Sequence, residues 1–167
     1  MSNLKQAIKV NYVKCVQDPS YFINQYCTIQ HPQRGKIKFK LYDFQYDVLK
    51  EYQENDYNVI LKSRQLGIST LSAAYALWMM LFHNDKNVLC IATTKDTAKN
   101  IVTKVRIMYD GLPVWLKTQI VENNKLSLVF KNGSQIKALA STESAGRSEA
   151  LSLLILDEAA FIEKIDV

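Results

Sequence analysis

Apolar side chains recur every three to four positions at the start of the chain, which predicts an amphipathic helix over residues 4–17. The apolar positions of this helix are Leu4, Ile8, Tyr12, Cys15 and Val16. The run Asp18-Pro19-Ser20 is typical of a helix end, and a short helical piece is expected in YFINQYC, residues 21–27. A further helix is predicted for YDFQYDVLKEYQEN, residues 42–55.

Between these helices, residues 31–41 contain a loop and then a segment in which apolar residues alternate with lysines. One side of the segment has Ile37, Phe39 and Leu41, and the other side has Lys36, Lys38 and Lys40. The basic stretch RGKIKFK could follow a nucleic-acid backbone. Lysines opposite apolar residues are more typical of the solvent face of an edge strand, and we favour that interpretation.

From residue 58 onward, short apolar strands alternate with helices. Strands are expected at NVILKS (58–63), NVLCIAT (87–93) and LSLLIL (151–156). Helices are expected at residues 69–82 and 94–109, and a short one at 112–120. Two β-prone runs, LSLVF and QIKALA, surround Asn132-Gly133, which is a strong hairpin signal.

This alternation predicts an α/β fold with a largely parallel sheet and helices on both of its faces. Continuous apolar strands such as SLLIL are typical of a sheet that is covered on both sides. In such folds, ligands bind at the carboxyl ends of the strands. Two candidate motifs lie at such ends: the loop of residues 62–70 and the acidic pair Asp157-Glu158.

The composition is that of a globular protein, because 48% of the 167 residues are hydrophobic and 22% are charged. No apolar run approaches the roughly 20 residues that a membrane-spanning helix needs, and the N-terminus lacks the apolar core of a signal peptide. We therefore expect an intracellular protein with no membrane partner. The net charge of +5 mildly favours an anionic partner, meaning nucleotide or nucleic acid, and decides little alone.

The three cysteines, Cys15, Cys27 and Cys90, are an odd number without a C-x-x-C pair. We therefore expect neither a disulfide framework nor a zinc site. We expect free thiols in a reducing compartment. His31 and His83 are isolated in the sequence and support no metal site.

The acidic pair follows an apolar strand, as in the second nucleotide-binding signature of phosphate-loop ATPases. A carboxylate at the strand end, Asp157, can hold Mg²⁺ directly or through water. The next carboxylate, Glu158, can polarise a water for attack on the γ-phosphate. Taken alone, the pair would more often be two solvated acids at the end of a buried strand.

The loop LKSRQLGIST, residues 61–70, has the outline of a phosphate-binding loop. On the template G-x-x-x-x-G-K-[ST], Gly67 is the second glycine and Ser69 is the hydroxyl residue on the magnesium side. Two positions differ from the template: Ile68 replaces the lysine, and Lys62 replaces the first glycine. An ordinary strand-to-helix turn with Ser69 as the helix cap is the alternative. The crowding of cations in this turn, and the free N–H groups of the helix that follows, favour an anion site.

Three segments together resemble the large terminase subunits of tailed bacteriophages, the motors that package DNA into capsids. They are FKLYDFQ, KSRQLGIST and STESAGRSEALSLLILDEAAFI, in this order, and the resemblance covers nearly the whole chain. It implies an ATPase with ATP and Mg²⁺ as cofactors and an ASCE or RecA-like phosphate-loop core. It also implies double-stranded DNA, a portal protein and a small terminase subunit as partners, a ring on the capsid, and the cytoplasm of an infected bacterium.

The resemblance assigns roles to individual residues. Some family members have the loop lysine displaced to the first position, so Lys62 replaces the cation absent at Ile68. The nucleotide-binding residues are then Lys62, Ser63, Arg64, Gln65, Leu66, Gly67, Ile68, Ser69 and Thr70, with Ser69 and Asp157 as ligands of Mg²⁺. Gln45 is expected to read the adenine edge with its amide; without the family match it would be a solvent-facing glutamine.

Two arginines are candidates for stabilising charge in the transition state. Arg147, ten residues before Asp157, is a candidate finger that acts on a neighbouring subunit, and Arg64 is a candidate within the same subunit. A loop arginine paired with Glu143 or Glu149 is a nearly equal alternative for Arg147.

We divide the chain into a helical or lid segment, residues 1–40, and an ATPase core, residues 41–167. The family's coupling motif and nuclease domain would follow Val167 and are not expected in this chain. A helicase-type ATPase is one rival, weakened by the missing standard lysine. A non-catalytic module that binds nucleotide or partners through a degenerate loop is another: Ile68 favours it, and the retained Glu158 argues against it.

Overall fold

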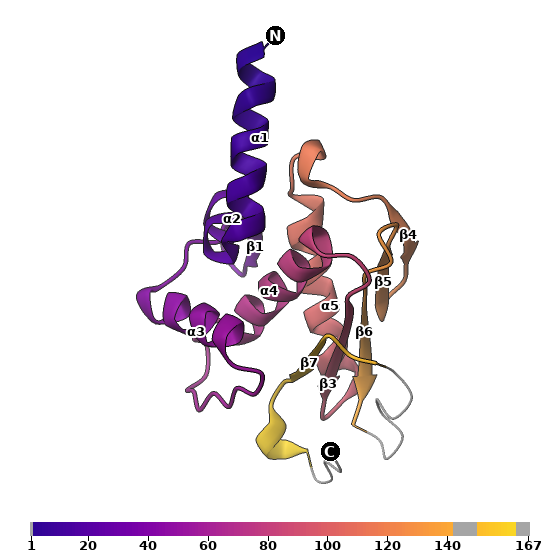
Figure 1. The fold of residues 1–167 in the computed structure, drawn as a ribbon. Helices are drawn as coiled ribbons and strands as arrows, with labels where there is room; N and C mark the ends of the chain where they lie inside the picture. Colours follow the sequence, from indigo (N-terminus) through magenta and orange to yellow (C-terminus); the bar gives the residue numbers. More distant parts are fainter. Residues whose placement is uncertain (1, 142–149, 163–167) are drawn as a thin grey trace.

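The computed structural model of the chain describes residues 2–141 and 150–162 (Figure 1). Its N-terminal part has two helices, α1 (Ser2–Gln17) and α2 (Pro19–Tyr26). The Asp18 carboxylate accepts a hydrogen bond from the Ser20 backbone N–H at 2.7 Å, so it caps α2 and separates the helices as the sequence predicted. Helix α1 projects from the body of the molecule (Figure 1). The Trp78 indole anchors the C-terminal end of α1 by donating to the Cys15 carbonyl at 2.7 Å.

A small hairpin follows, made of β1 (Thr28–His31) and β2 (Gly35–Lys38) in antiparallel register. The alternating segment is confirmed, because Phe39 is buried while Lys36, Lys38 and Lys40 are exposed. The Lys38 ammonium donates to the Gln25 carbonyl at 3.0 Å, so this lysine is tied to the protein's own backbone. Strand β1 was not predicted; it forms because the lysine-rich segment needs a hydrogen-bonding partner.

Helix α3 (Asp43–Glu54) lies beside α4 (Ile68–Phe82), in agreement with the sequence prediction. Almost every side chain of α4 is at least partly buried, since this helix packs against α2, α3 and α5 (Lys95–Asp110). The Thr94 hydroxyl caps α5 by accepting from the Thr97 N–H at 3.2 Å.

The main sheet has five strands in the order β4-β5-β6-β3-β7. They are β3 (Asn87–Ala92), β4 (Ile120–Asn123), β5 (Ser127–Phe130), β6 (Gln135–Ala140) and β7 (Leu153–Leu156). Strands β6, β3 and β7 are parallel, whereas β4, β5 and β6 are antiparallel neighbours. The sheet is thus mixed rather than largely parallel, because the predicted hairpin joins it directly. The short helix expected at 112–120 is only a 3₁₀ turn, Val114–Leu116, before β4.

The Asn132-Gly133 turn joins β5 to β6 as predicted. Gly133 has φ of +82°, and a Cβ atom there would collide with the Asp85 carboxylate. The Asn132 side-chain amide donates to the Met80 carbonyl at 2.8 Å, which ties the turn to the end of α4. Glycine is therefore required both by the backbone and by the close approach of Asp85.

One face of the sheet contributes to the main core. Val88, Cys90 and Ala92 of β3 belong to the same buried cluster as α4 and α5, together with Ile136 and Ala138 of β6. The alternate residues of these strands lie outside that cluster, and Leu139 and Leu154 are each 38% exposed. Among the described residues α4 and α5 share the core on this face, while Leu89 on the other face of β3 is only 1% exposed, so helices on both faces stay a prediction.

The predicted strand at residues 58–63 is also wrong. Residues 58–63 have no regular structure, and the side chains of Val59 and Leu61 are 100% and 102% exposed. Strand β7 forms the edge of the sheet within the described residues, and the 58–63 segment does not pair with it. Apolar β-prone residues form a strand only where a partner strand satisfies their backbone groups.

Candidate functional site

The two candidate motifs meet at the carboxyl end of β7. The backbone N–H of Asp157 donates to the Ile91 carbonyl at 2.9 Å, which continues the pairing of β7 with β3 by one residue. The Ser69 hydroxyl, in the first turn of α4, donates to the Asp157 carboxylate at 2.9 Å. These residues are 88 positions apart in sequence, so the fold brings together two oxygen-bearing side chains that were each predicted as magnesium ligands.

The loop before α4 leaves most of its polar groups free. No backbone N–H of residues 59–66 donates a hydrogen bond to another described residue. Gln65 and Gly67 have φ of +65° and +72°, which turns the backbone sharply before the helix. Free N–H groups beside a helix N-terminus attract anions, since the helix dipole is positive there.

The cationic side chains of this loop, like its backbone N–H groups, have no partner among the described residues. Lys62 and Arg64 are exposed, and neither makes a hydrogen bond or ion pair with another described residue. Ser63 is exposed as well, while Ile68 is only 8% exposed and packs into the core as expected of a side chain beneath the loop. The loop therefore presents positive charge to solvent from positions 62 and 64 rather than from position 68.

Gln45 is buried, at 1% exposure, and its amide links α3 to the loop. Its Nε2 donates to the Leu66 carbonyl at 3.0 Å, and its Oε1 accepts from the Tyr42 backbone N–H at 3.1 Å. An amide has one further N–H and one further lone pair, so a role in reading adenine stays a prediction. A Cβ atom on Gly67 would lie 3.0 Å from this Nε2, a tight contact that adds to the constraint of the φ of +72° at this position.

Glu158 has its backbone in the left-handed region, with φ of +56° and ψ of +39°. Such a conformation costs a non-glycine residue about 1–3 kcal/mol and is concentrated at functional sites. It begins a 3₁₀ turn, Ala159–Phe161, and the Glu158 carbonyl accepts from the Phe161 N–H at 3.0 Å. Glu158 is exposed and directly follows Asp157 in the chain, and its role as general base stays a prediction.

Sequence reasoning missed Lys104 and Tyr52, which the fold brings near Asp157. Burial lowers the pKa of Lys104, the Asp157 charge raises it and the Lys62 charge lowers it further, so all three groups are electrostatic neighbours. Burial raises the pKa of Tyr52, whose hydroxyl lies 2.9 Å from Ser72 Oγ in α4. One signal was available for Lys104: it borders the apolar stripe of α5, which runs through Ile101, Val105 and Met108.

The other predicted residues add little to this geometry. Thr70 is in α4, and its N–H donates to the Gly67 carbonyl at 3.1 Å. Arg147 lies outside the described residues, together with Glu143 and Glu149.

The three cysteines are free and buried, as expected. Burial raises the pKa of the Cys90 thiol to about 12, with a smaller contribution from Asp157.

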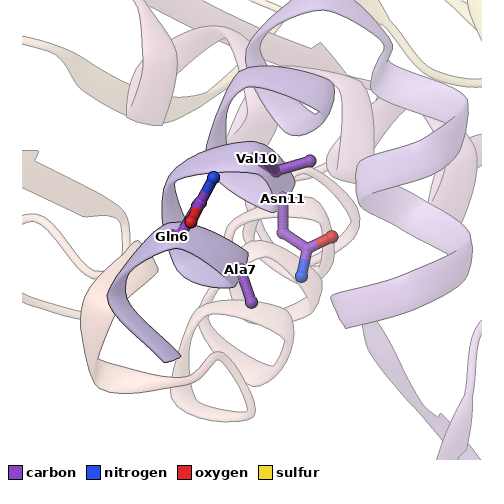
Figure 2. Close-up of a pocket in the computed structure, with 4 residues that line it drawn as sticks. All are labelled: Gln6, Ala7, Val10 and Asn11. Atoms are coloured by element: carbon purple, nitrogen blue, oxygen red, sulfur yellow. The ribbon is translucent and has the colours of Figure 1, made fainter. Parts of the chain in front are cut away.

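A pocket of about 320 Å³ lies on α1, away from this site (Figure 2). Gln6, Ala7, Val10 and Asn11 line it, all from one helix and none charged. It offers no cation to a phosphate, so we place the candidate site at the strand ends. The described residues contain no cluster of three or more His, Cys, Asp and Glu side chains that could hold a metal, and none of their helices is long and apolar enough to cross a membrane.

The residues present fit a magnesium nucleotide. Hydroxyl and carboxylate oxygens are the ligands that Mg²⁺ takes from proteins, and it usually keeps waters and substrate phosphates as its other ligands. The hydrogen bond between Ser69 and Asp157 places one oxygen of each kind side by side. Free N–H groups and cations of the 62–67 loop complete the donor set that a polyphosphate needs.

The fold and the site together define an α/β protein similar to phage terminases, with a mixed sheet flanked by helices. The family model for the terminase large subunit, T4likevirus-type, N-terminal part, matches residues 59–166, which is more than half of the chain. The chain belongs to this family of terminase large subunits.

A solved structure, the large terminase of bacteriophage HK97, is similar in fold, with a TM-score of 0.66 and 19% sequence identity. The match covers 84% of this chain and 30% of the HK97 chain, so the present chain spans less than a third of that protein.

Proposed function

We propose that this chain is the ATP-hydrolysing part of a phage large terminase, with a phosphate-loop core of the ASCE type, and that it drives DNA translocation into the capsid. One observation carries the proposal: the Ser69 hydroxyl lies 2.9 Å from the Asp157 carboxylate, across 88 residues of sequence. Membership of the terminase family supports the same conclusion.

In this proposal each residue has a defined task. Free N–H groups of the loop and the Lys62 ammonium hold the phosphates, and Ser69 and Asp157 hold Mg²⁺, which neutralises charge on the phosphates when bound. Glu158 orients a water and accepts its proton. Arg147 or Arg64 supplies positive charge to the transition state, and Gln45 contacts the adenine.

The proposed partners follow from the family. They are double-stranded DNA, a portal protein, a small terminase subunit and further copies of the motor in a ring, in the cytoplasm of an infected bacterium. The net charge of +5 is consistent with a polyanionic partner.

Isothermal titration with ATP, with and without Mg²⁺, tests the proposal. We expect ATP to bind to a folded sample more tightly with Mg²⁺, and Asp157→Asn to lose most of this difference. Asp110→Asn is a matched control, because Asp110 is an exposed acid at the end of α5. Absence of ATP binding by the folded chain, or an equal magnesium effect in the Asp157 variant, contradicts the proposal.

A second candidate is a module that binds nucleotide without turnover. The buried Ile68 in place of the loop lysine, and the absence of residues 58–63 from the sheet, favour it. Phosphate release in the assembled motor separates the two, because the module would bind ATP and release no phosphate.

A further inference from the structure

Helix α3 faces α4 and the loop with one stripe of side chains. Gln45, Leu49 and Tyr52 are spaced by four and then three residues, so they lie on the same face of α3. Leu49 is 1% exposed and Tyr52 is partly buried, which places this face against the core. Gln45 donates to the Leu66 carbonyl of the loop at 3.0 Å. Tyr52 lies two turns further along the same face, and its hydroxyl contacts α4 instead of the loop.

The Tyr52 hydroxyl begins a chain of hydrogen bonds with a defined direction. It lies 2.9 Å from Ser72 Oγ in α4, and Ser72 Oγ lies 3.1 Å from the Ile68 carbonyl. A carbonyl can only accept and a serine hydroxyl has a single proton, so Ser72 donates to Ile68 and Tyr52 donates to Ser72. Burial raises the pKa of the Tyr52 phenol, so the phenol keeps the proton that this donation needs. The chain therefore runs from Tyr52 through Ser72 to the Ile68 carbonyl.

This chain ends at the first peptide group of α4. Ile68 is the first residue of the helix, and its carbonyl shares a planar peptide group with the Cα atom of Ser69. A hydrogen bond that fixes the direction of this carbonyl therefore also fixes the Cα atom from which the Ser69 hydroxyl projects. That hydroxyl donates to the Asp157 carboxylate at 2.9 Å. The end of a helix frays unless such contacts hold it, so the chain supports the position of a predicted magnesium ligand.

We infer that Tyr52 is a positioning residue for the bound magnesium nucleotide, because it orients Ser69 through Ser72. This inference rests on the proposed nucleotide site. It gives α3 two points of attachment to the phosphate-binding segment. Gln45 holds the loop at Leu66, and Tyr52 holds the first turn of α4.

The variant Tyr52→Phe tests this role, because it removes the hydroxyl and keeps the ring that packs on Tyr75 with centroids 5.3 Å apart. Isothermal titration with ATP, with and without Mg²⁺, measures how much Mg²⁺ increases the affinity. We expect this increase to be roughly 2- to 12-fold smaller in Tyr52→Phe than in the parent, the range for the loss of one hydrogen bond. The affinity for ATP without Mg²⁺ should change less than about twofold, because the chain orients a ligand of the metal.

The variant Tyr75→Phe is a matched control. The Tyr75 hydroxyl donates to the backbone carbonyl of Tyr52 at 3.3 Å, so it also joins α4 to α3, but not through Ser72 or Ile68. Thermal unfolding should show a similar loss of stability in the two variants, since each loses one hydrogen bond between the helices. The effect of Mg²⁺ on ATP affinity should be retained in Tyr75→Phe. An equal loss of this effect in both variants would show that the Tyr52 hydroxyl only supports the fold, and would overturn the inference.

The variant Ser72→Ala tests the route, because it removes the middle of the chain. We expect it to lose the same magnesium effect as Tyr52→Phe, and the double variant to lose less than about twofold more, since both residues act through one chain. Additive losses would mean that Tyr52 does not act through Ser72, and would overturn the inference. If Mg²⁺ increases ATP affinity equally in the parent and in Tyr52→Phe, the inference alone fails. If the folded parent binds no ATP, both the inference and the proposed function fail.

Discussion

At the scale of single residues, the site combines backbone strain with unpaired charge. Gln65 and Glu158 are non-glycine residues in the left-handed region, on the loop and at the acidic pair respectively. Each conformation costs about 1–3 kcal/mol, and such cost persists where the surrounding structure imposes it. Lys62 and Arg64 add exposed cations without a described partner. The coincidence of both features at one edge of the sheet supports a binding site for an anion.

The displaced lysine gives the first prediction. Lys62→Ala should weaken Mg-ATP binding by about 1.5–3 kcal/mol, or roughly 10- to 150-fold, because it removes a charge-assisted contact. Ile68→Ala should leave ATP affinity nearly unchanged, since its side chain is buried and packs beneath the loop. Isothermal titration measures both, with Lys36→Ala on the exposed face of β2 as a control. Equal affinities for Lys62→Ala and the parent would leave Arg64 as the phosphate cation of the loop.

Glu158 gives the second prediction. Glu158→Gln keeps the shape of the side chain but removes its basicity, so ATP should bind as to the parent while hydrolysis slows at least ~100-fold. Phosphate release by the assembled motor is the measurement. Glu54→Gln is a suitable control, because Glu54 is an exposed acid at the end of α3. Unchanged turnover in the Glu158 variant would remove this residue from the mechanism.

At the scale of elements, the loop is supported by helices and not by a strand. Residues 58–63, expected to lead into it as a strand, lie outside the sheet and expose Val59 and Leu61. Its position depends instead on Gln45 of α3, which bonds the Leu66 carbonyl, and on Ser69 of α4, which bonds Asp157. The contact between α3 and the loop is therefore a structural determinant of the site.

The Gln45 amide gives the third prediction. Gln45→Ala leaves the Leu66 carbonyl and the Tyr42 N–H without their partners, which should lower the free energy of unfolding by about 1–3 kcal/mol. Amide hydrogen exchange in residues 62–67 should also become faster. Urea unfolding and exchange followed by mass spectrometry measure these effects. Gln53→Ala, at an exposed position of the same helix, should change neither; equal behaviour of the two variants would mean that Gln45 does not hold the loop.

At the scale of the whole molecule, the described chain has one well-filled core on one side of its sheet. That core joins α1, α2, α4 and α5 to alternate residues of β3, β5 and β6. All three cysteines lie in it, fully buried. Burial raises the pKa of the Cys15 thiol to about 12 and that of Cys90 to about 12, so both stay protonated in the folded protein above the pH at which free thiols ionise.

These thiols give the fourth prediction. Because their pKa is raised on folding from about 9.0 to about 12, their contribution to stability is complete below pH 9 and is lost progressively as the pH rises toward 12. In that window each thiol adds a slope of up to about 1.4 kcal/mol per pH unit. The urea midpoint at several pH values between 8 and 11 measures it, in the parent and in Cys90→Ala. The urea midpoint of Cys90→Ala should fall less steeply above pH 9 than that of the parent. Equal slopes of the urea midpoint in the two proteins would contradict the burial of this thiol.

The sequence by itself determined the elements whose signals are local. The period of apolar residues placed α4, β3 and α5 within a residue or two of their observed bounds. The Asn132-Gly133 turn was predicted because only a few residues accept its backbone, and Gly133 has the expected positive φ. The acidic end of β7 was likewise visible, since an apolar run stops at two carboxylates there, although β7 itself is only partly buried.

Tertiary structure decided what depends on distant partners. Residues 58–63 have the composition of a strand, yet they pair with no strand of the described chain, although the outer edge of β7 has no strand partner there. The mixed order of the sheet followed from where the β5-β6 hairpin docked. The contact of Ser69 with Asp157 and the half-buried position of Lys104 arose from packing between segments far apart in sequence. Sequence patterns report the preference of each segment, whereas burial and electrostatic proximity are set only when α4, α5 and β7 come together.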